Sequence, residues 1–227
     1  MISPQSNHEQ SKNILVFDTE TSGLPLDRLG KISDSSNWPH IMQLSFIVYD
    51  TGKNRVLKEG DYIINVPDNV EISPESTAIH GIDRKRCNRE GIPIKEAIRE
   101  FKKWLNIADM VVAHNMEFDK KMIMVECSRN KMMHSLYNNK AYFCTMKSSV
   151  DLCKLVAISK KSGKQYYKYP TLMELHDKLF GSTPRNLHDS FVDILICFRC
   201  FYKIRFGEDI GYKNRRIGSL LVKRCSL

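Results

Sequence analysis

The sequence has no long hydrophobic run. None of its apolar stretches approaches the ~18 residues that a membrane-spanning helix needs. The opening residues, MISPQSNHEQSKN, also lack the apolar core of a secretory signal. We therefore expect an intracellular protein, in the cytoplasm or the nucleus, that is neither secreted nor bound to a membrane.

A disulfide framework and a metal-binding cysteine cluster are missing as well. The seven cysteines are odd in number and scattered, which is typical of free or buried thiols in a reducing compartment. Cys197 and Cys200 have C-x-x-C spacing, but no second pair completes a zinc site and no strand-to-helix turn precedes them as in a redox motif. We interpret them as small core residues on one helix face.

Repeats and low-complexity segments are also absent. The 227 residues are 42% hydrophobic, 9% aromatic and 27% charged, which is typical of a globular protein rather than a disordered or fibrous one. The length favours one domain. We expect a flexible polar tail over residues 1–12, the domain over residues 13–206, and a basic C-terminal tail, docked or mobile, over residues 207–227.

Positive charge is in excess. The chain carries 35 Lys and Arg against 26 Asp and Glu, a net charge of +9, which favours a polyanionic partner such as nucleic acid. One segment, Lys160–Tyr169 (KKSGKQYYKY), interleaves lysines with tyrosines, which can neutralise phosphates and stack on bases. A solvated surface loop is the alternative interpretation of this segment.

The hydrophobic pattern predicts an α/β domain. Apolar, β-branched runs predict three consecutive antiparallel strands at 13–17, 41–49 and 55–66. Further on, the pattern predicts helices at 74–80, 93–106, 117–128, 171–179 and 189–206, and short strands at 110–113 and 142–145. A meander followed by alternating strands and helices predicts three layers around a mixed five-stranded sheet.

Two acids follow the first predicted strand. Side chains alternate along a strand, so Asp18 and Glu20 are expected to point to the same side. Two carboxylates on one side repel each other unless a cation joins them. Acids in a solvated loop are the alternative, but a strand end is where α/β folds place ligands.

Two further groups of polar residues lie at element boundaries. The run Val111–Asp119 (VVAHNMEFD) is an apolar strand that opens into a helix, with His114 and Asn115 at the strand exit and Asp119 in the first turns of the helix. His188 and Asp193 lie at the start of the last helix, where both can face one cleft. Taken singly, each pattern is weak.

In this order, Asp-x-Glu, His-Asn-x-x-Phe-Asp and His-x-x-x-x-Asp resemble the DEDD superfamily of 3′-to-5′ exonucleases, in its histidine branch, the family of the proofreading subunit of bacterial replicative DNA polymerase. The resemblance spans residues 13–206 and includes the landmarks Asn37–Pro39, Ile79–Ile82, Phe143–Met146 and Tyr169–Leu172. The chain departs from the family pattern at Ser190, where a small apolar residue is usual, and at Asp189, which adds a charge beside the histidine.

The resemblance implies a ribonuclease H-like fold and a two-metal site. Two Mg²⁺ ions, with Mn²⁺ as a substitute, would be held by Asp18, Glu20 and Asp193, and by Asp119 directly or through water. The four carboxylates carry −4 and two divalent ions +4, so the site becomes neutral when both ions bind. Such a site implies two-metal phosphodiester hydrolysis, with His188 as the general base.

The resemblance also implies substrate contacts. Leu24, after the tight turn at Gly23, resembles the family's apolar wedge beside the terminal base, and a core leucine is the alternative. The other substrate contacts that we expect are Thr19, Thr21, His114 and Asn115.

The function that we expect is a metal-dependent 3′-to-5′ exonuclease, which hydrolyses single-stranded DNA or frayed 3′ ends to 5′-mononucleotides. An exoribonuclease is the alternative, because the motif acids do not select the sugar. A catalytically silent nucleic-acid-binding module would have lost at least one of the five motif residues. The chain is short for a polymerase, so we expect a free-standing enzyme or a proofreading subunit in trans, with replication or repair proteins as partners.

Overall fold

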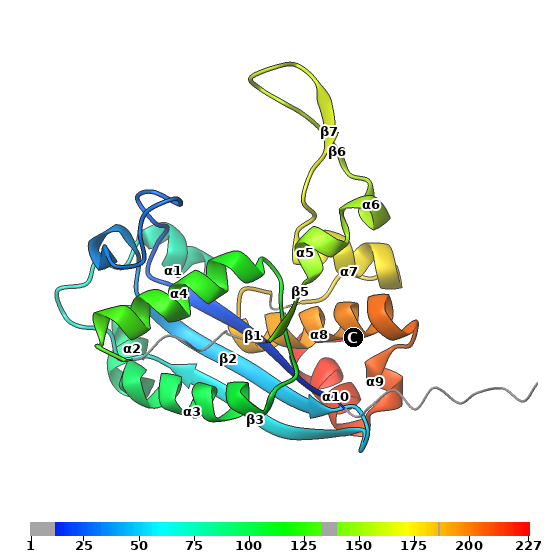
Figure 1. The fold of residues 1–227 in the computed structure, drawn as a ribbon, viewed down its shortest axis with the longest axis horizontal. Helices are drawn as coiled ribbons and strands as arrows, with labels where there is room; N and C mark the ends of the chain where they lie inside the picture. The colour runs from blue at the N-terminus through cyan, green and yellow to red at the C-terminus, as the bar shows by residue number, and fades with distance from the viewer. Residues whose placement is uncertain (1–11, 133–139, 186) are drawn as a thin grey trace, which may run out of the picture.

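The centre of the protein is a five-stranded sheet with the strand order β3-β2-β1-β4-β5 (Figure 1). The computed structural model describes residues 12–132, 140–185 and 187–227. The strands of the sheet are β1 (Asn13–Thr21), β2 (Ile41–Asp50), β3 (Arg55–Ile63), β4 (Met110–Ala113) and β5 (Ala141–Cys144). β1, β2 and β3 form an antiparallel meander, whereas β4 and β5 run parallel to β1 and to each other. The predicted mixed five-stranded sheet is confirmed.

Helices cover both faces of this sheet. One face packs against α3 (Ile94–Ile107) and α4 (Met116–Arg129), with α1 (Pro74–His80) and α2 (Arg84–Glu90) at the margin. The other face packs against α8 (Ser190–Phe206), which α7 (Leu172–Phe180) contacts in turn. β1 serves both cores because its side chains alternate: Leu15 and Phe17 lie in the first core, and Ile14 and Val16 in the second.

Most boundaries lie within one or two residues of the prediction, with two informative exceptions. β1 continues four residues beyond its predicted end, because Asp18 to Thr21 still pair with β2. β3 ends at Ile63, three residues before the predicted Val66. Hydrophobic patterning marks where a strand is buried, whereas pairing with a neighbour decides how far it runs.

Several short elements were not predicted. They are a 3₁₀ turn at Ser35–Asn37, α2, α5 (Thr145–Ser148), α6 (Val150–Cys153), β6 (Val156–Ile158) and β7 (Gln165–Tyr167). β6 and β7 pair with each other in a separate two-stranded sheet. This hairpin projects from the body of the protein between α6 and α7 (Figure 1).

The C-terminal segment 207–227 packs against the domain. It forms α9 (Ile210–Lys213), α10 (Arg215–Leu220) and a π-helical turn (Leu221–Cys225). α9 and the π-helical turn contact α8, and α10 contacts β3. Ile210, Ile217 and Cys225 are fully buried in the second core. Residues 1–11, in the predicted N-terminal tail, lie outside the described residues.

Two expectations about composition can be compared with the structure. All seven cysteines are free thiols, and Cys197 and Cys200 are buried on α8. Among the described residues, none of the helices combines the length and the apolar character that crossing a membrane requires.

Burial of the C-terminal segment can be tested by mutation. Ile217→Ala removes a fully buried side chain and should lower the free energy of unfolding by about 2–5 kcal/mol. Tyr212→Ala, at a residue that is 91% exposed on the same segment, should change it by less than about 0.5 kcal/mol. Urea denaturation of both variants measures the difference, and identical curves would place the segment outside the cooperative unit.

Candidate functional site

Three carboxylates meet where α8 crosses the end of β1. Asp18 and Glu20 point to the same side of β1, as their spacing predicts, and Asp193 reaches them from the first turn of α8. One oxygen atom from each of the three lies within 4.8 Å of the others. Residues 175 positions apart in the sequence, from Asp18 to Asp193, thus form one acidic cluster.

Neutral hydrogen bonds fix the start of α8 against β1. The Ser190 hydroxyl donates to the Asp18 carbonyl at 2.9 Å, and the Ser190 amide donates to the side-chain oxygen of Gln43 at 3.2 Å. Asp189 caps the helix by accepting from the amides of Phe191 and Val192. Ser190, which replaces the small apolar residue usual in the family, therefore links α8 to β1 by hydrogen bonds. Gln43 was not predicted as part of the site, although a polar residue within the mostly apolar run of β2 could have indicated a buried polar contact.

Asp119 approaches from the opposite face of the sheet. It lies in the first turn of α4 and is 2% exposed. Its Oδ1 atom accepts from the Thr19 amide at 3.2 Å and from the Thr19 hydroxyl at 2.8 Å. Thr19 points away from Asp18 and Glu20 and is 6% exposed, so its hydroxyl binds Asp119. The structure thus gives Thr19 a role in positioning the fourth acid.

His188 lies at the edge of this cluster, on the turn that precedes α8. It is exposed and has a left-handed backbone with φ of 74°. Its amide donates to Oδ1 of Asp193 at 3.3 Å, which ties the turn to the acidic cluster. The imidazole makes no hydrogen bond to the part of the chain that the structure describes. Its ring nitrogens thus have no protein partner there.

A protein-family model described as exonuclease, RNase_T, matches residues 15–201. The chain belongs to this exonuclease family. The match contains the two strand-borne acids, Asp119, His188 and Asp193, and it agrees with the fold described above. No curated protein matches the sequence.

Solved structures of exonuclease I share the fold. One has a TM-score of 0.65 and 16% identity, covering 88% of this chain and 43% of that one. E. coli exonuclease I in complex with a dA16 oligonucleotide has a TM-score of 0.63 and 15% identity, covering 93% of this chain and 43% of that one. A zinc-bound E. coli ExoI–ssDNA complex has a TM-score of 0.63 and 15% identity, covering 89% of this chain and 43% of that one. The predicted ribonuclease H-like exonuclease fold is confirmed, and this chain spans less than half the length of exonuclease I.

The four acids receive no compensating charge from the residues that the structure describes. Among the described residues, none of the four forms an ion pair with a Lys, Arg or His side chain. Burial raises the pKa of Asp18 to about 7. Burial, together with the neighbouring acids, raises the pKa of Glu20 to about 10. The pKa values of Asp119 and Asp193 rise well above the usual range for the same two reasons.

This donor set fits divalent cations. Crowded carboxylate oxygens without a protein counter-charge are the ligands that a hard cation such as Mg²⁺ or Mn²⁺ prefers. Bound positive charge would also return the four acids to their ionised forms. The cluster therefore has the carboxylate ligands of a metal site, and its ionised form requires positive charge that a metal would supply.

A pocket lies between the loop after β1 and the start of α4. Leu24 lines it together with Trp38, Asn115, Phe118 and Lys121. Leu24 is 70% exposed, so it is not a core leucine, and its position at the pocket is consistent with a contact to substrate. Asn115 has a left-handed backbone with φ of 71° at the start of α4 and is exposed to the same pocket.

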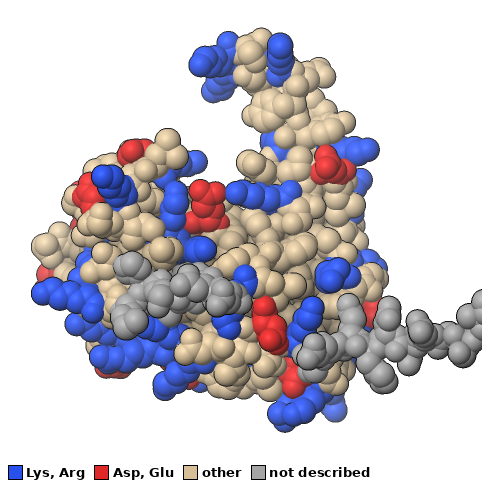
Figure 2. Space-filling view, viewed as in Figure 1, with Lys and Arg blue, Asp and Glu red and all other residues tan. Residues whose placement is uncertain are grey.

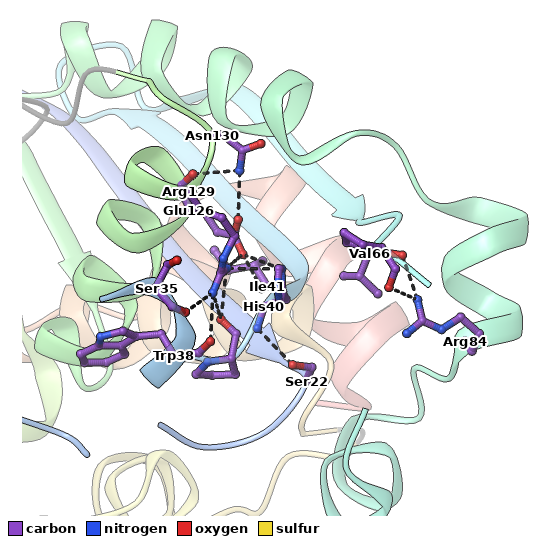
Figure 3. Close-up of polar contacts among 12 residues, drawn as sticks. Ser22, Ser35, Trp38, His40, Ile41, Val66, Arg84, Glu126, Arg129 and Asn130 are labelled. Carbon is purple, nitrogen blue, oxygen red and sulfur yellow. Dashed lines mark hydrogen bonds and ion pairs between the residues drawn. The ribbon is translucent and has the colours of Figure 1, made fainter. Parts of the chain in front are cut away.

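The loop that carries one wall of this pocket is fastened to α4 by a half-buried arginine, Arg129 (Figure 3). The Arg129 guanidinium donates to the carbonyls of Ser35 and Trp38 at 2.8 and 2.9 Å and forms an ion pair with Glu126. Glu126, which is 1% exposed, also accepts from the amide of Ile41. The Arg129–Glu126 ion pair thus holds both the loop and the start of β2 in place.

His114 serves the architecture of the site. Its Nε2 atom lies 3.2 Å from the Pro170 carbonyl, which can only accept, so Nε2 carries the proton. Burial lowers the pKa of His114 to about 4, so the ring is neutral and its Nδ1 accepts from the Thr145 hydroxyl at 2.9 Å. Both ring nitrogens are engaged by the protein, which leaves neither free for a predicted substrate contact.

His80 and Thr21 close the end of β1. The Thr21 hydroxyl donates to the Gly23 carbonyl at 2.8 Å, so it stabilises the turn before Leu24. Nδ1 of His80 accepts from the amide of Ile82, and its Nε2 therefore donates to the Thr21 carbonyl at 3.2 Å. In the sequence, His80 is identified only as part of the family segment Ile79–Ile82. In the structure it fixes the end of β1, which carries Asp18 and Glu20.

Crowding of the acids predicts a pH-dependent stability in the absence of metal. The pKa of Glu20 is about 10 in the folded protein and 4.5 in the unfolded chain, so the folded state binds more protons between those values. The free energy of unfolding should therefore fall as pH rises through this window. Glu20→Gln should raise the melting temperature in chelator, by roughly 2–4 °C per kcal/mol of repulsion removed, and more at pH 8 than at pH 5.

Melting curves in chelator across this pH range provide the measurement. Glu71→Gln, at an exposed loop residue, removes the same charge away from the cluster and should leave the pH dependence unchanged. Equal effects of the two substitutions would show that Glu20 is not electrostatically strained.

Proposed function

We propose that this protein is a metal-dependent 3′-to-5′ exonuclease of the histidine branch, which hydrolyses single-stranded DNA or frayed 3′ ends to 5′-mononucleotides. The acidic cluster of Asp18, Glu20 and Asp193 within an exonuclease fold carries the proposal. Binding of DNA oligonucleotides and single-stranded DNA by the structurally similar E. coli exonuclease I supports DNA as the substrate.

In this proposal the carboxylates hold the metals. Asp18, Glu20 and Asp193 would hold two Mg²⁺ or Mn²⁺ ions, and Asp119 would complete the site directly or through water. When bound, these ions would supply charge neutralisation and polarisation of the scissile phosphodiester. The hydrogen bonds from Thr19 to Asp119 and from Ser190 to the Asp18 carbonyl support the roles of the acids, because they fix the strand and both helices before substrate arrives.

His188 would take the proton of the attacking water. Its exposed imidazole is free of hydrogen bonds to the described residues, and its backbone is tied to Asp193, so the ring can reach water beside the acids. Leu24 and Asn115 would contact the terminal nucleotide in the adjoining pocket. All five motif residues are present, which argues against a silent binding module.

The same chemistry would cleave RNA, since the acids do not distinguish the sugar. We assign the activity to residues 13–206, with segment 207–227 as an addition packed on α8. The roles that we propose are trimming or repair of nucleic acid, or proofreading, and replication or repair proteins would be the partners.

A panel of labelled substrates tests the proposal. Linear single-stranded DNA should be shortened from its 3′ end, and duplex DNA with a frayed 3′ end should follow, because an unpaired base avoids an unstacking cost of a few kcal/mol. Activity should require Mg²⁺ or Mn²⁺ and vanish in chelator. Cleavage of circular single-stranded DNA would contradict an exonuclease, and faster cleavage of RNA would support the alternative.

Two neighbouring acids provide a matched pair of variants for this assay. Asp193→Asn should abolish activity, since it removes a proposed ligand. Asp189→Asn removes the same charge four residues earlier but preserves the helix cap, because Asn and Asp are equivalent N-caps. It should retain activity within a few-fold. Equal losses in the two variants would contradict the assignment of Asp193.

His188 is best tested by asparagine. Its left-handed backbone is a conformation that asparagine tolerates better than alanine does, so His188→Asn removes the base without backbone strain. Cleavage should slow by roughly 10²- to 10⁴-fold, whereas metal binding and the melting temperature should be unchanged. Cleavage rates of the two proteins at saturating metal provide the measurement, and an unchanged rate in the variant would assign the base elsewhere.

A further inference from the structure

The β6–β7 hairpin is an arm whose apolar side chains are largely uncovered by the residues that the structure describes. Val156, Ile158, Tyr166 and Tyr167 are between 49% and 65% exposed. The register pairs Val156 with Tyr167 and Ala157 with Tyr166, so the two tyrosines lie on opposite faces of the hairpin. Both faces are thus open to solvent.

The arm is also strongly basic. Residues 154–173 contain five lysines and no Asp or Glu. Lys168, at the base, pairs with Glu174 at 2.6 Å. Lys160, Lys161 and Lys164 at the tip are exposed and form no ion pair with the described residues, and Figure 2 shows Lys and Arg gathered at the end of the projection.

Physical stability argues that something covers the arm. A two-stranded hairpin is marginally stable in water unless one of its faces packs against another surface. Exposed tyrosines between lysines are costly as plain surface, but they provide stacking platforms beside phosphate-binding charges. The absence of acids makes a polyanion the favoured occupant over a protein of mixed charge.

The base of the arm lies next to the end of β4. The segment that carries the arm begins after β5 at Thr145 and ends before α7 at Pro170, and both residues hydrogen-bond to His114, directly after β4. Asn115, the next residue, lines the pocket of Leu24. Figure 2 shows the surface hollowed between the arm and the lobe that carries α4 and the loop after β1.

We propose that the arm binds the single-stranded part of a nucleic acid upstream of the 3′ end that lies in the site. Bases stack on Tyr166 or Tyr167, and Lys160, Lys161 and Lys164 contact phosphates. The strand pairing ends at Ile158 and Gln165, and the three lysines lie in the turn beyond it, roughly 10 Å from Val156 at ~3.3 Å per residue. We place their contacts on nucleotides away from the 3′ end, because the arm projects from the body of the protein (Figure 1). This inference rests on the proposed function for where the strand ends, but not for the binding itself.

Binding in chelator separates the two. The probe is a labelled oligothymidylate, and its anisotropy is measured against salt concentration with wild-type protein. Replacing Lys160, Lys161 and Lys164 together by alanine should reduce the slope of log K against log salt by about 2 and weaken binding on the order of 100-fold at 0.1 M salt. The control replaces Lys53, Arg55 and Lys223, which are exposed elsewhere, and should weaken binding only a few-fold.

Stacking has its own variants. Tyr166→Ala and Tyr167→Ala, tested singly, should together identify at least one position where binding weakens by roughly 5- to 150-fold. The corresponding phenylalanine variant should restore it, because the ring is retained. Loss of binding in both the alanine and the phenylalanine variants would point to a structural role instead.

Cleavage distinguishes failure of this inference from failure of the proposed function. The lysine variant should show a higher KM on long oligothymidylate with an unchanged rate on a thymidine dinucleotide, which is too short to reach the arm. If wild-type protein binds through the arm but never cleaves, the proposed function fails alone. If the triple lysine variant bound oligothymidylate as tightly as the control variant, the arm would not be a single-strand site, and a protein partner would be favoured. The same conclusion would follow if the lysine substitutions weakened binding to blunt duplex DNA as much as binding to single strands.

Discussion

Mutual repulsion among four carboxylates is the constraint on which the arrangement of this protein depends. Asp18, Glu20, Asp119 and Asp193 come from one strand and two helices, and burial raises the pKa of every one of them. Groups that repel one another stay together only if the elements that carry them are held by something stronger. The two apolar cores on either side of β1 provide that force, since each packs one of the two helices against the strand.

The hydrogen bonds nearest the acids come from neutral groups. Ser190, Gln43 and Thr19 fix the strand and the helices through hydroxyl, amide and backbone groups. A lysine or arginine in these places would neutralise the carboxylates permanently and compete with a metal for them. The ion pair of the half-buried Arg129 with the buried Glu126 lies instead at the far end of α4, where it secures the loop that lines the pocket of Leu24.

The two sides of the site differ in how they are built. The loop after β1 is held by polar contacts to Arg129 and presents Leu24 to the pocket. The β6–β7 arm forms no comparable contacts with the described residues, and it carries lysines and tyrosines on a projection from the body of the protein (Figure 1). In the proposed complex, the fixed loop would position the terminal nucleotide. The extended basic arm would bind the phosphates of nucleotides farther along the nucleic acid.

The sequence by itself determined the mixed sheet, the buried helices and the identity of the acids. Alternation along β1 places Asp18 and Glu20 together, and the apolar spacing of α8 brings Asp193 to the same face, because both are local consequences of backbone geometry. Only the tertiary structure decided what the neighbouring polar residues do. The Thr19 hydroxyl donates to Asp119, both ring nitrogens of His114 are engaged by Thr145 and Pro170, and segment 207–227 forms helices that pack onto the domain. Such roles depend on partners 31 to 100 positions away in the sequence, and local patterning carries no information about which distant group a side chain will meet.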